Sequence, residues 1–194
     1  MCAASSATCA CSPQTDRVTD PLDLRLRTAR LILRAPAAGD AADLVRGCAE
    51  WEVARWTANI PHPYGLEDAE RYIADARAAI AEVRALIFAL ERVDAPGLIG
   101  VVGISLDGPG EQGDIGWWIA IPFQGQGYAT EAAACAVEFA RAMGVKRLTA
   151  GTDPDNLVSQ NVVRKLGMRP AGRLVRAQPA RGAPRETLEF VLTL

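Results

Sequence analysis

The feature that most restricts the fold of this chain is a glycine-rich loop between an apolar run and an alanine-rich segment. GDIGWWIAIP is followed by FQGQG and then by YATEAAACAVEFARAMG. We expect a strand, a tight loop and a helix over residues 114–143, and the apolar stripe of that helix is Ala132, Ala136, Phe139 and Met143. The start of a helix leaves backbone N–H groups unpaired, and glycines let the chain expose more of them. With the helix dipole added, the segment predicts a phosphate or pyrophosphate site, the alternative being a tight turn whose glycines serve backbone geometry alone.

Two common nucleotide-binding motifs do not fit this loop. The phosphate loop of NTP-binding proteins needs a Gly-Lys pair, and none follows the glycines here. The dinucleotide motif GxGxxG also fails, because Gly125 and Gly127 are followed by Tyr128 to Glu131 without a third glycine. The sequence therefore disfavours NTP and NAD as ligands of the loop.

The first third of the chain predicts one strand and two helices. Leucines and arginines alternate over residues 24–34, and this period of two indicates a half-buried strand that ends at Pro36. A helix is expected over about 39–55, and the proline-rich residues 60–65 form a loop. A second helix follows, and its apolar face is Ala69, Ile73, Ala76, Ile80 and Val83.

The remaining apolar runs predict a sheet. ALIFALERV, GLIGVVGISLDG and GDIGWWIAIP are separated by turn residues and indicate an antiparallel meander. The third run is apolar on both faces, so we expect it in the interior of the sheet. After the glycine-rich loop and its helix, VKRLTAGT predicts a strand, and residues 156–166 a short helix. The final strands are expected near 172–177 and 186–193.

The composition limits the class of protein. The chain has 194 residues, of which 49% are hydrophobic and 23% charged, and this predicts one soluble domain with a sizeable core. We expect no nucleic acid as a partner, because the formal net charge is −2 and basic residues do not cluster. No apolar stretch approaches the roughly 18 residues of a membrane span, so no membrane is expected either.

The cysteines and the first residues point to a reducing compartment. The five cysteines are odd in number, and Cys2, Cys9 and Cys11 crowd the start of the chain, which does not fit a secreted disulfide framework. Residues 1–22 are mostly small and polar and are interrupted by prolines, so we expect a disordered arm. They do not resemble a secretory leader, because no basic start is followed by an apolar stretch. We therefore expect a cytoplasmic protein. No metal is expected, since Cys9 and Cys11 fall short of the usual four ligands.

The loop and two other motifs together resemble the GNAT superfamily of acetyl-CoA-dependent N-acetyltransferases. The cofactor loop of that family reads (Q/R)xxGx(G/A), and Gln124, Gly127 and Ala129 match it. DIGWWIAIPFQGQGYATEA, TARLILRAPAAGDAADL and NLVSQNVVRKLGM are similar to the branch that acetylates ribosomal-protein N-termini, the RimJ/RimL-like enzymes. The resemblance covers nearly all of residues 24–194.

This resemblance implies a fold and a reaction. The fold would be α/β (α+β), a mixed and mostly antiparallel central sheet of about six to seven strands with about four flanking helices, splayed at the cofactor site. Residues 23–194 would form this acetyltransferase domain, as a monomer or a homodimer. Acetyl-CoA would be the co-substrate, and the acetyl group would pass directly to a primary amine. The acceptor would be a protein N-terminus or a small-molecule amine such as an aminoglycoside, amino acid or polyamine.

The resemblance also assigns residues to the cofactor. Backbone N–H groups of the loop would hold the pyrophosphate, with the Thr130 hydroxyl as a further donor, and the end of the central strand would pair with the pantetheine arm. The residues expected to bind the cofactor are Ile119, Ala120, Ile121, Gln124, Gly125, Gln126, Gly127, Tyr128, Ala129, Thr130, Asn156 and Ser159.

Three residues are candidates for catalysis. An N–H group near Ile119 would polarise the thioester carbonyl. Ser159 in the NxxS motif would stabilise the departing thiolate, since the position where some family members carry a tyrosine is Val163 here. Asn156 has a second explanation as an ordinary N-cap, and Ser159 as a solvent-facing helical serine. The proton acceptor is open: a family glutamate falls near Gln178, which cannot serve. Asp114 and, near the acceptor loop, Glu50 or Glu52 are substitutes, although a solvated surface carboxylate is the more common role for each of them.

The acceptor side is expected between residues 50–64 and the C-terminal hairpin. Trp56, His62 and Tyr64 are candidates for substrate binding, although a tryptophan here could equally anchor a helix on the sheet. A protein of another class, a non-catalytic acyl-CoA-binding module, also fits a cofactor loop without an obvious base. Release of free thiol from acetyl-CoA in the presence of an amine separates the two.

Overall fold

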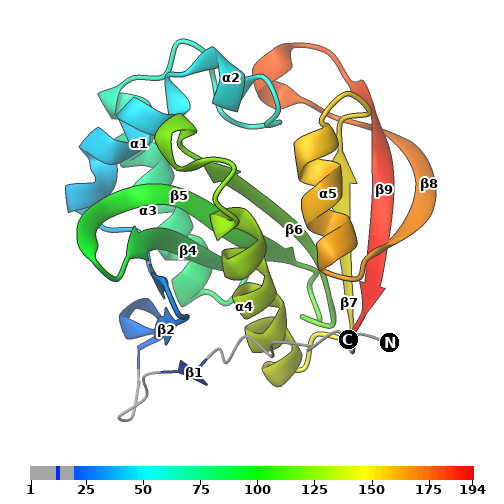
Figure 1. Ribbon diagram of the computed structural model, residues 1–194, viewed down its shortest axis with the longest axis horizontal. Coiled ribbons are helices and arrows are strands. Elements are labelled where there is room, and N and C mark those ends of the chain that lie inside the picture. Colours follow the sequence, from blue (N-terminus) through cyan, green and yellow to red (C-terminus); the bar gives the residue numbers. More distant parts are fainter. Residues whose placement is uncertain (1–11, 14–19) are drawn as a thin grey trace, which may run out of the picture.

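A computed structural model describes residues 12–13 and 20–194 (Figure 1). Within them one sheet contains the strands β1 (Ser12–Pro13), β2 (Arg25–Arg27), β3 (Leu31–Arg34), β4 (Ala85–Arg92), β5 (Ala95–Leu106), β6 (Gln112–Ile119), β7 (Arg147–Thr152), β8 (Arg169–Arg176) and β9 (Arg185–Thr193). The α-helices are α1 (Ala41–Cys48), α2 (Trp51–Ala54), α3 (Leu66–Ala81), α4 (Tyr128–Ala142) and α5 (Leu157–Lys165). Short 3₁₀ helices are η1 (Pro21–Asp23), η2 (Ala38–Asp40), η3 (Ile121–Phe123) and η4 (Pro179–Arg181).

The sheet is mixed and mostly antiparallel, as expected. Its strand order is β1-β2-β3-β4-β5-β6-β7-β9-β8. The meander β4-β5-β6 is confirmed, and β6 lies in the interior with antiparallel β5 on one side and parallel β7 on the other. The described residues contain more strands than the six to seven expected, partly because the first one is divided.

The expected single strand over residues 24–34 is a hairpin. β2 and β3 pair antiparallel, and the Thr28 N–H donates to the Leu31 carbonyl at 2.9 Å across the turn. Leu26, Leu31 and Leu33 are fully buried in both arms. The prediction of one strand was wrong because the turn contains no glycine or proline to mark it. The only sign of the reversal is a change of phase, since the buried leucines move from an even position at Leu26 to odd positions at Leu31 and Leu33.

The helices also differ from the expectation in detail. The helix expected over 39–55 is interrupted between α1 and α2, where Glu50 is extended with ψ 120°. On α3 the predicted apolar face is buried except Val83, which lies beyond the helix and is 50% exposed. On α4 the predicted Met143 is 53% exposed at the C-cap, whereas Ala132 and Ala136 are fully buried.

The two faces of the sheet carry separate hydrophobic clusters. One cluster joins buried residues of α4 with those of β2 to β7, and includes Val163 of α5. The other lies under α1 and α3 and includes Leu44, Ile73 and Val101. Trp118 of β6 packs against the second cluster, and Ile119 belongs to the first. Consecutive side chains of β6 therefore serve opposite faces, which accounts for its apolar character on both.

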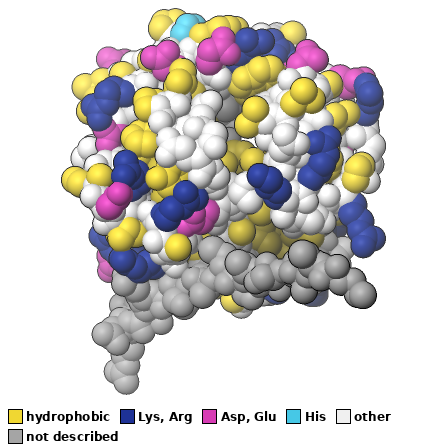
Figure 2. Space-filling model, in the orientation of Figure 1, with side chains coloured by type: hydrophobic (Ala, Val, Ile, Leu, Met, Phe, Trp, Pro, Cys, Tyr) yellow, Lys and Arg dark blue, Asp and Glu magenta, His cyan; other side chains and the backbone are white. Residues whose placement is uncertain are grey.

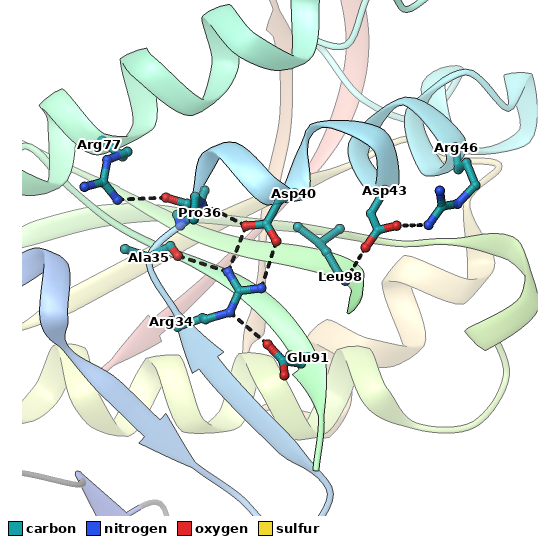
Figure 3. Close-up of polar contacts among 10 residues, drawn as sticks. Arg34, Ala35, Pro36, Asp40, Asp43, Arg46, Arg77, Glu91 and Leu98 are labelled. Atoms are coloured by element: carbon teal, nitrogen blue, oxygen red, sulfur yellow. Dashed lines mark hydrogen bonds and ion pairs between the residues drawn. The ribbon is translucent and has the colours of Figure 1, made fainter. Parts of the chain in front are cut away.

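A buried ion pair fastens the start of α1 to the sheet (Figure 3). The Arg34 guanidinium donates to both Asp40 oxygens at 2.8 Å and to Glu91 at 2.9 Å. Burial opposes ionisation of Asp40, but the bonds from Arg34 and the Ala37 N–H outweigh it, and the pKa of Asp40 lies below its ordinary value. This network explains the second arginine of TARLILR and the aspartate that follows it as parts of the scaffold.

The expected arm of residues 1–22 falls largely outside the described residues, as do Cys2, Cys9 and Cys11. Of its described part, Ser12–Pro13 pairs with β2, and η1 begins at Pro21 with the Asp20 side chain as its N-cap. Among the described residues, no helix is long and apolar enough to cross a membrane. The same residues contain no group of three His, Cys, Asp or Glu side chains suited to a metal ion.

Candidate functional site

The central feature of the site is a wedge between β6 and β7. The two strands pair over a short stretch that ends at Asp114 and Thr149, and they diverge from there (Figure 1). β6 remains paired with β5 as far as Ile119 and Gly100, and β7 with β9 as far as Thr152 and Leu188. The sheet therefore splits between two strands that each keep their outer partner, as the expected splay requires.

The backbone of β6 presents unpaired groups to this wedge. The Ala120 N–H donates to the Ile99 carbonyl at 2.9 Å, so it faces β5. Because N–H groups alternate in direction along a strand, those of Trp117 and Ile119 face the wedge. Of the expected cofactor contacts in this stretch, Ile119 is well placed and the Ala120 N–H is already bonded within the sheet. Ile121 begins η3, with a 42% exposed side chain.

The glycine-rich loop folds on its own side chains. The Gln124 side chain donates to the Ile119 carbonyl at 2.7 Å, and the Gln126 side chain donates to the Pro122 carbonyl at 3.0 Å. Gly125 has φ 74° and Gly127 has φ 85°, which only glycine adopts without strain. The loop motif thus shapes the backbone through its glutamines and glycines.

The N-terminus of α4 is open to a ligand. Its N-cap is Gly127, which supplies no capping side chain, and the first N–H groups of a helix have no partner within the helix. Those groups belong to Tyr128, Ala129 and Thr130. A Cβ added to Gly125 would meet nothing within 4 Å, so the space beside the loop is clear. Uncapped N–H groups, the helix dipole and open space fit a pyrophosphate.

Helix α5 begins near the carboxyl end of β7. The Asn156 side chain accepts from the Ser159 N–H at 3.0 Å, which confirms Asn156 as the N-cap. Ser159 lies in the first turn and is partly exposed. Val163, one turn further along the same helix, is completely buried. Ser159 is therefore the hydroxyl that this helix offers at its N-terminal end.

The expected base Asp114 belongs to a charge cluster. Arg176 donates to its two oxygens at 2.8 and 2.9 Å, and Thr149 donates to it at 2.8 Å. Arg176 also contacts Glu189, and it crosses Gly151 so closely that a Cβ there would lie 2.8 Å from its Nε. The bond to Asp114 is the largest cause that raises the pKa of Arg176. Both Asp114 oxygens accept hydrogen bonds within this cluster, so we assign this carboxylate the role of holding Arg176 in place rather than that of a base.

The three residues expected to bind the acceptor differ in how deeply they are buried. Tyr64 is 7% exposed and packs in the cluster under α1 and α3, where burial raises the pKa of its hydroxyl. Its expected contact with substrate is not supported by this position. Trp56 stacks on Arg55, with the guanidinium 4.4 Å from its ring centroid. His62 lies with its ring 5.2 Å from that of Trp51.

Arg181, which no sequence motif marks, joins the two walls of the proposed acceptor side. Arg181, in the turn before β9, donates to the backbone carbonyls of Ala54, Thr57 and Ile60. Its guanidinium also lies 5.4 Å from the Trp51 ring centroid. These partners are more than 120 residues away along the chain, and no spacing motif marks such a contact.

Charges of both signs are spread over the face that carries α4 and α5. Figure 2 shows basic and acidic side chains interspersed there among hydrophobic ones, without a continuous basic stripe over the described residues in this view. A ligand anion bound on this face would therefore depend on local groups such as the α4 N-terminus.

The chain is similar in sequence to known acetyltransferases. Residues 30–169 match the model of the acetyltransferase (GNAT) domain. A Bacillus subtilis protein described as the uncharacterized N-acetyltransferase YoaA is 29% identical over 170 residues, 84% of this chain and 92% of that protein.

Two solved structures share the fold closely. RimJ of Mycobacterium smegmatis in complex with CoA-disulfide has a TM-score of 0.74 and 25% identity, covering 89% of this chain and 83% of that one. A putative ribosomal-protein-serine acetyltransferase of Vibrio cholerae has a TM-score of 0.76 and 23% identity, covering 89% of this chain and 99% of that one.

Proposed function

The chain belongs to the GNAT acetyltransferase family, and from this premise we propose that it transfers the acetyl group of acetyl-CoA to the amine of a protein N-terminus. One observation carries the proposal: the β6–β7 wedge leads directly to an uncapped helix N-terminus. A wedge with unpaired strand N–H groups suits an amide-containing arm, and the helix N-terminus suits the diphosphate at the end of that arm.

The cofactor would lie along a continuous backbone surface. N–H groups from Gly125 to Thr130 would hold the pyrophosphate, and the Trp117 N–H would pair with the pantetheine arm, which leaves the Ile119 N–H for the thioester at the end of that arm. The loop glutamines would act indirectly, because their side chains are bonded to the loop's own carbonyls. This binding needs no basic patch, which agrees with the formal net charge of −2.

The reaction would be direct attack of a neutral amine on the thioester. The Ile119 N–H would polarise the thioester carbonyl, and the Ser159 hydroxyl would donate to the departing thiolate. A cysteine-bound acyl group is disfavoured for Cys48, because burial raises the pKa of its thiol to about 12. With both Asp114 oxygens bonded to Arg176, the amine proton would leave through solvent rather than to that carboxylate.

The acceptor would enter between the 51–62 segment and the turn that carries Arg181. A protein N-terminus is the acceptor that we test first, because the Vibrio cholerae protein with this fold is described as a putative ribosomal-protein-serine acetyltransferase. The same scaffold can serve small-molecule amines, and fold similarity by itself does not select the acceptor.

The proposal is tested by the release of free CoA thiol from acetyl-CoA. Peptides with Ser, Ala or Met at the N-terminus are compared with their N-acetylated forms, and with an aminoglycoside, a polyamine and free amino acids. We expect release with free peptide N-termini and none with the blocked peptides. Release with small amines alone would overturn the peptide assignment. Stabilisation by CoA without release for any amine would indicate a non-catalytic acyl-CoA-binding module.

A further inference from the structure

The turn between β2 and β3 lies against the first turn of α4. Glu131 of α4 accepts hydrogen bonds from the Thr28 hydroxyl at 2.6 Å and from the Arg30 backbone N–H at 3.0 Å. Its other oxygen accepts from the Arg30 Nε at 2.7 Å and pairs with the Arg30 Nη2 at 2.6 Å. A carboxylate near the proposed anion site is thus held by residues about a hundred positions earlier in the chain.

Arg30 also touches the glycine-rich loop itself. Its Nη1 donates to the Gln126 carbonyl at 3.0 Å. Its Nη2 lies 3.5 Å from where a Cβ of Gly127 would stand, and its guanidinium is 4.5 Å from the Tyr128 ring centroid. One side chain therefore contacts three consecutive residues at the point where the loop becomes the helix.

Without Arg30, the negative charge of Glu131 would oppose the binding of an anion at the N-terminus of α4. Partial burial opposes its ionisation, but the bonds from Thr28 and Arg30 outweigh burial and hold the pKa of Glu131 below its ordinary value. Glu131 is therefore ionised at neutral pH. A negative charge in the first turn of a helix is stabilised by the helix dipole, yet it repels an anionic ligand at the same N-terminus.

We propose that Arg30 is a positioning residue for the cofactor: it neutralises Glu131 and fixes residues 126–128 so that the α4 N–H groups face the pyrophosphate. This rests on the proposed function, which places acetyl-CoA at that loop. Arg30 has 47% of its side chain exposed, and its contacts are made with the loop and with Glu131 rather than in the core. It thus gives the first arginine of TARLILR a role that the second one, bonded to Asp40, does not share.

The proposal is tested with Arg30→Ala, Glu131→Gln and the double variant, using two acetyl donors. Acetyl-CoA carries the pyrophosphate, and S-acetylpantetheine lacks it. With acetyl-CoA we expect Arg30→Ala to raise KM about tenfold while kcat changes less than about twofold, because a charged contact is lost beside the anion. With S-acetylpantetheine, kcat/KM should stay unchanged. The double variant should regain part of the lost affinity for CoA, because the uncompensated carboxylate is gone.

Several outcomes would overturn the proposal. Equal losses with both donors would show that Arg30 supports the fold in general. A double variant no better than Arg30→Ala would show that Arg30 does not act by neutralising Glu131. Should Arg30→Ala destabilise the unliganded protein, Arg30→Lys carries the same comparison, since it retains the charge and loses the paired N–H donors. Arg27 of β2 is exposed and gives a matched control, and Arg27→Ala should leave kcat and KM unchanged with both acetyl donors. If the wild-type protein shows no binding of CoA, the proposed function fails rather than this inference.

Discussion

The cofactor side and the acceptor side of the wedge are assembled in opposite ways. On the cofactor side, the Gln124 side chain reaches a carbonyl five residues away, and the loop continues directly into α4. On the acceptor side, Arg181 reaches carbonyls more than 120 residues away, at the last residue of α2 and in the segment that follows it. The first region is encoded by contiguous residues, and the second exists only once the chain has folded.

This difference predicts how each region responds to change. A local loop fails when its own backbone is altered, and the rest of the molecule is little affected. A long-range junction fails when a single contact is removed, and its two walls then move relative to each other. The cofactor side should therefore be sensitive to glycine substitutions, and the acceptor side to the loss of Arg181.

The largest effect is expected from Gly125→Ala. At φ 74° a Cβ strains the backbone, and the new methyl group would enter the clear space beside the loop in which we place the pyrophosphate. We expect the Kd for CoA to rise about a hundredfold, equivalent to losing two hydrogen bonds to a charged group. Isothermal titration measures this.

A matched control separates strain from binding. Gly110 has φ 75°, lies between β5 and β6, and also has nothing within 4 Å of an added Cβ. Gly110→Ala should lower the stability by a similar amount, about 1 kcal/mol, and leave the Kd for CoA unchanged. Equal losses of affinity in both variants would contradict a backbone anion site at Gly125.

A smaller effect, on turnover, is expected at the border of the two regions. Ser159→Ala should lower kcat about 10- to 100-fold and leave the affinity for CoA nearly intact, because the hydroxyl would act on the departing thiolate. The Asn156 cap accepts from the backbone N–H of residue 159, so the helix start is preserved in this variant. Steady-state kinetics with saturating acceptor measures the change, and unchanged turnover would remove Ser159 from the mechanism.

The acceptor side should respond to Arg181→Ala. Three backbone carbonyls lose their donor, and the two acceptor walls lose their junction. We expect the KM of the peptide acceptor to rise about tenfold through misplacement, with the KM of acetyl-CoA unchanged. Arg185→Ala, four residues further along, is the control and should leave both constants alone. A rise in the KM of acetyl-CoA would show that the two regions are coupled, which would contradict their independent response to substitution.

The smallest effect concerns pH. The pKa of Glu131 in the folded protein lies below its ordinary value of 4.5, so ionised Glu131 stabilises the fold above that value, and the stabilisation is lost as the pH falls through the lowered pKa. The difference in Tm between wild type and Glu131→Gln should therefore be constant near neutral pH and shrink on acidification below about 4.5. Thermal unfolding from pH 3 to 7 checks this, and a difference independent of pH would contradict it.

The strand, the glycine-rich loop and the helix of the proposed cofactor side were predicted well from the sequence because their determinants are local. Glycines at positive φ, an alanine-rich helix and an apolar strand are properties of neighbouring residues, and all three lie where they were expected. The Asn156 cap and the α5 boundaries were predictable for the same reason. Local propensity was insufficient for the β2–β3 turn, since Thr28 stabilises it through a side-chain bond to the Leu31 N–H.

Burial on the proposed acceptor side was not predictable from the sequence, because it depends on distant elements. An aromatic cluster suggested substrate binding, yet Tyr64 packs under α1 and α3 while Trp51 remains 45% exposed. Asp114 was a plausible base until Arg176, brought in by β8, occupied its oxygens. Residue type and spacing do not reveal partners that tertiary contacts supply.

The most direct test of the cofactor site is to follow backbone amide resonances of the 20.6 kDa protein during titration with CoA and with pantetheine. With CoA, we expect large shifts for Gly125, Gly127 and Tyr128 in the loop and for Trp117 and Ile119 in the wedge. With pantetheine, which lacks the pyrophosphate, the wedge amides should still shift and the loop amides should not. Saturable binding of CoA that leaves the loop resonances unshifted would show that the pyrophosphate does not bind at the glycine-rich loop.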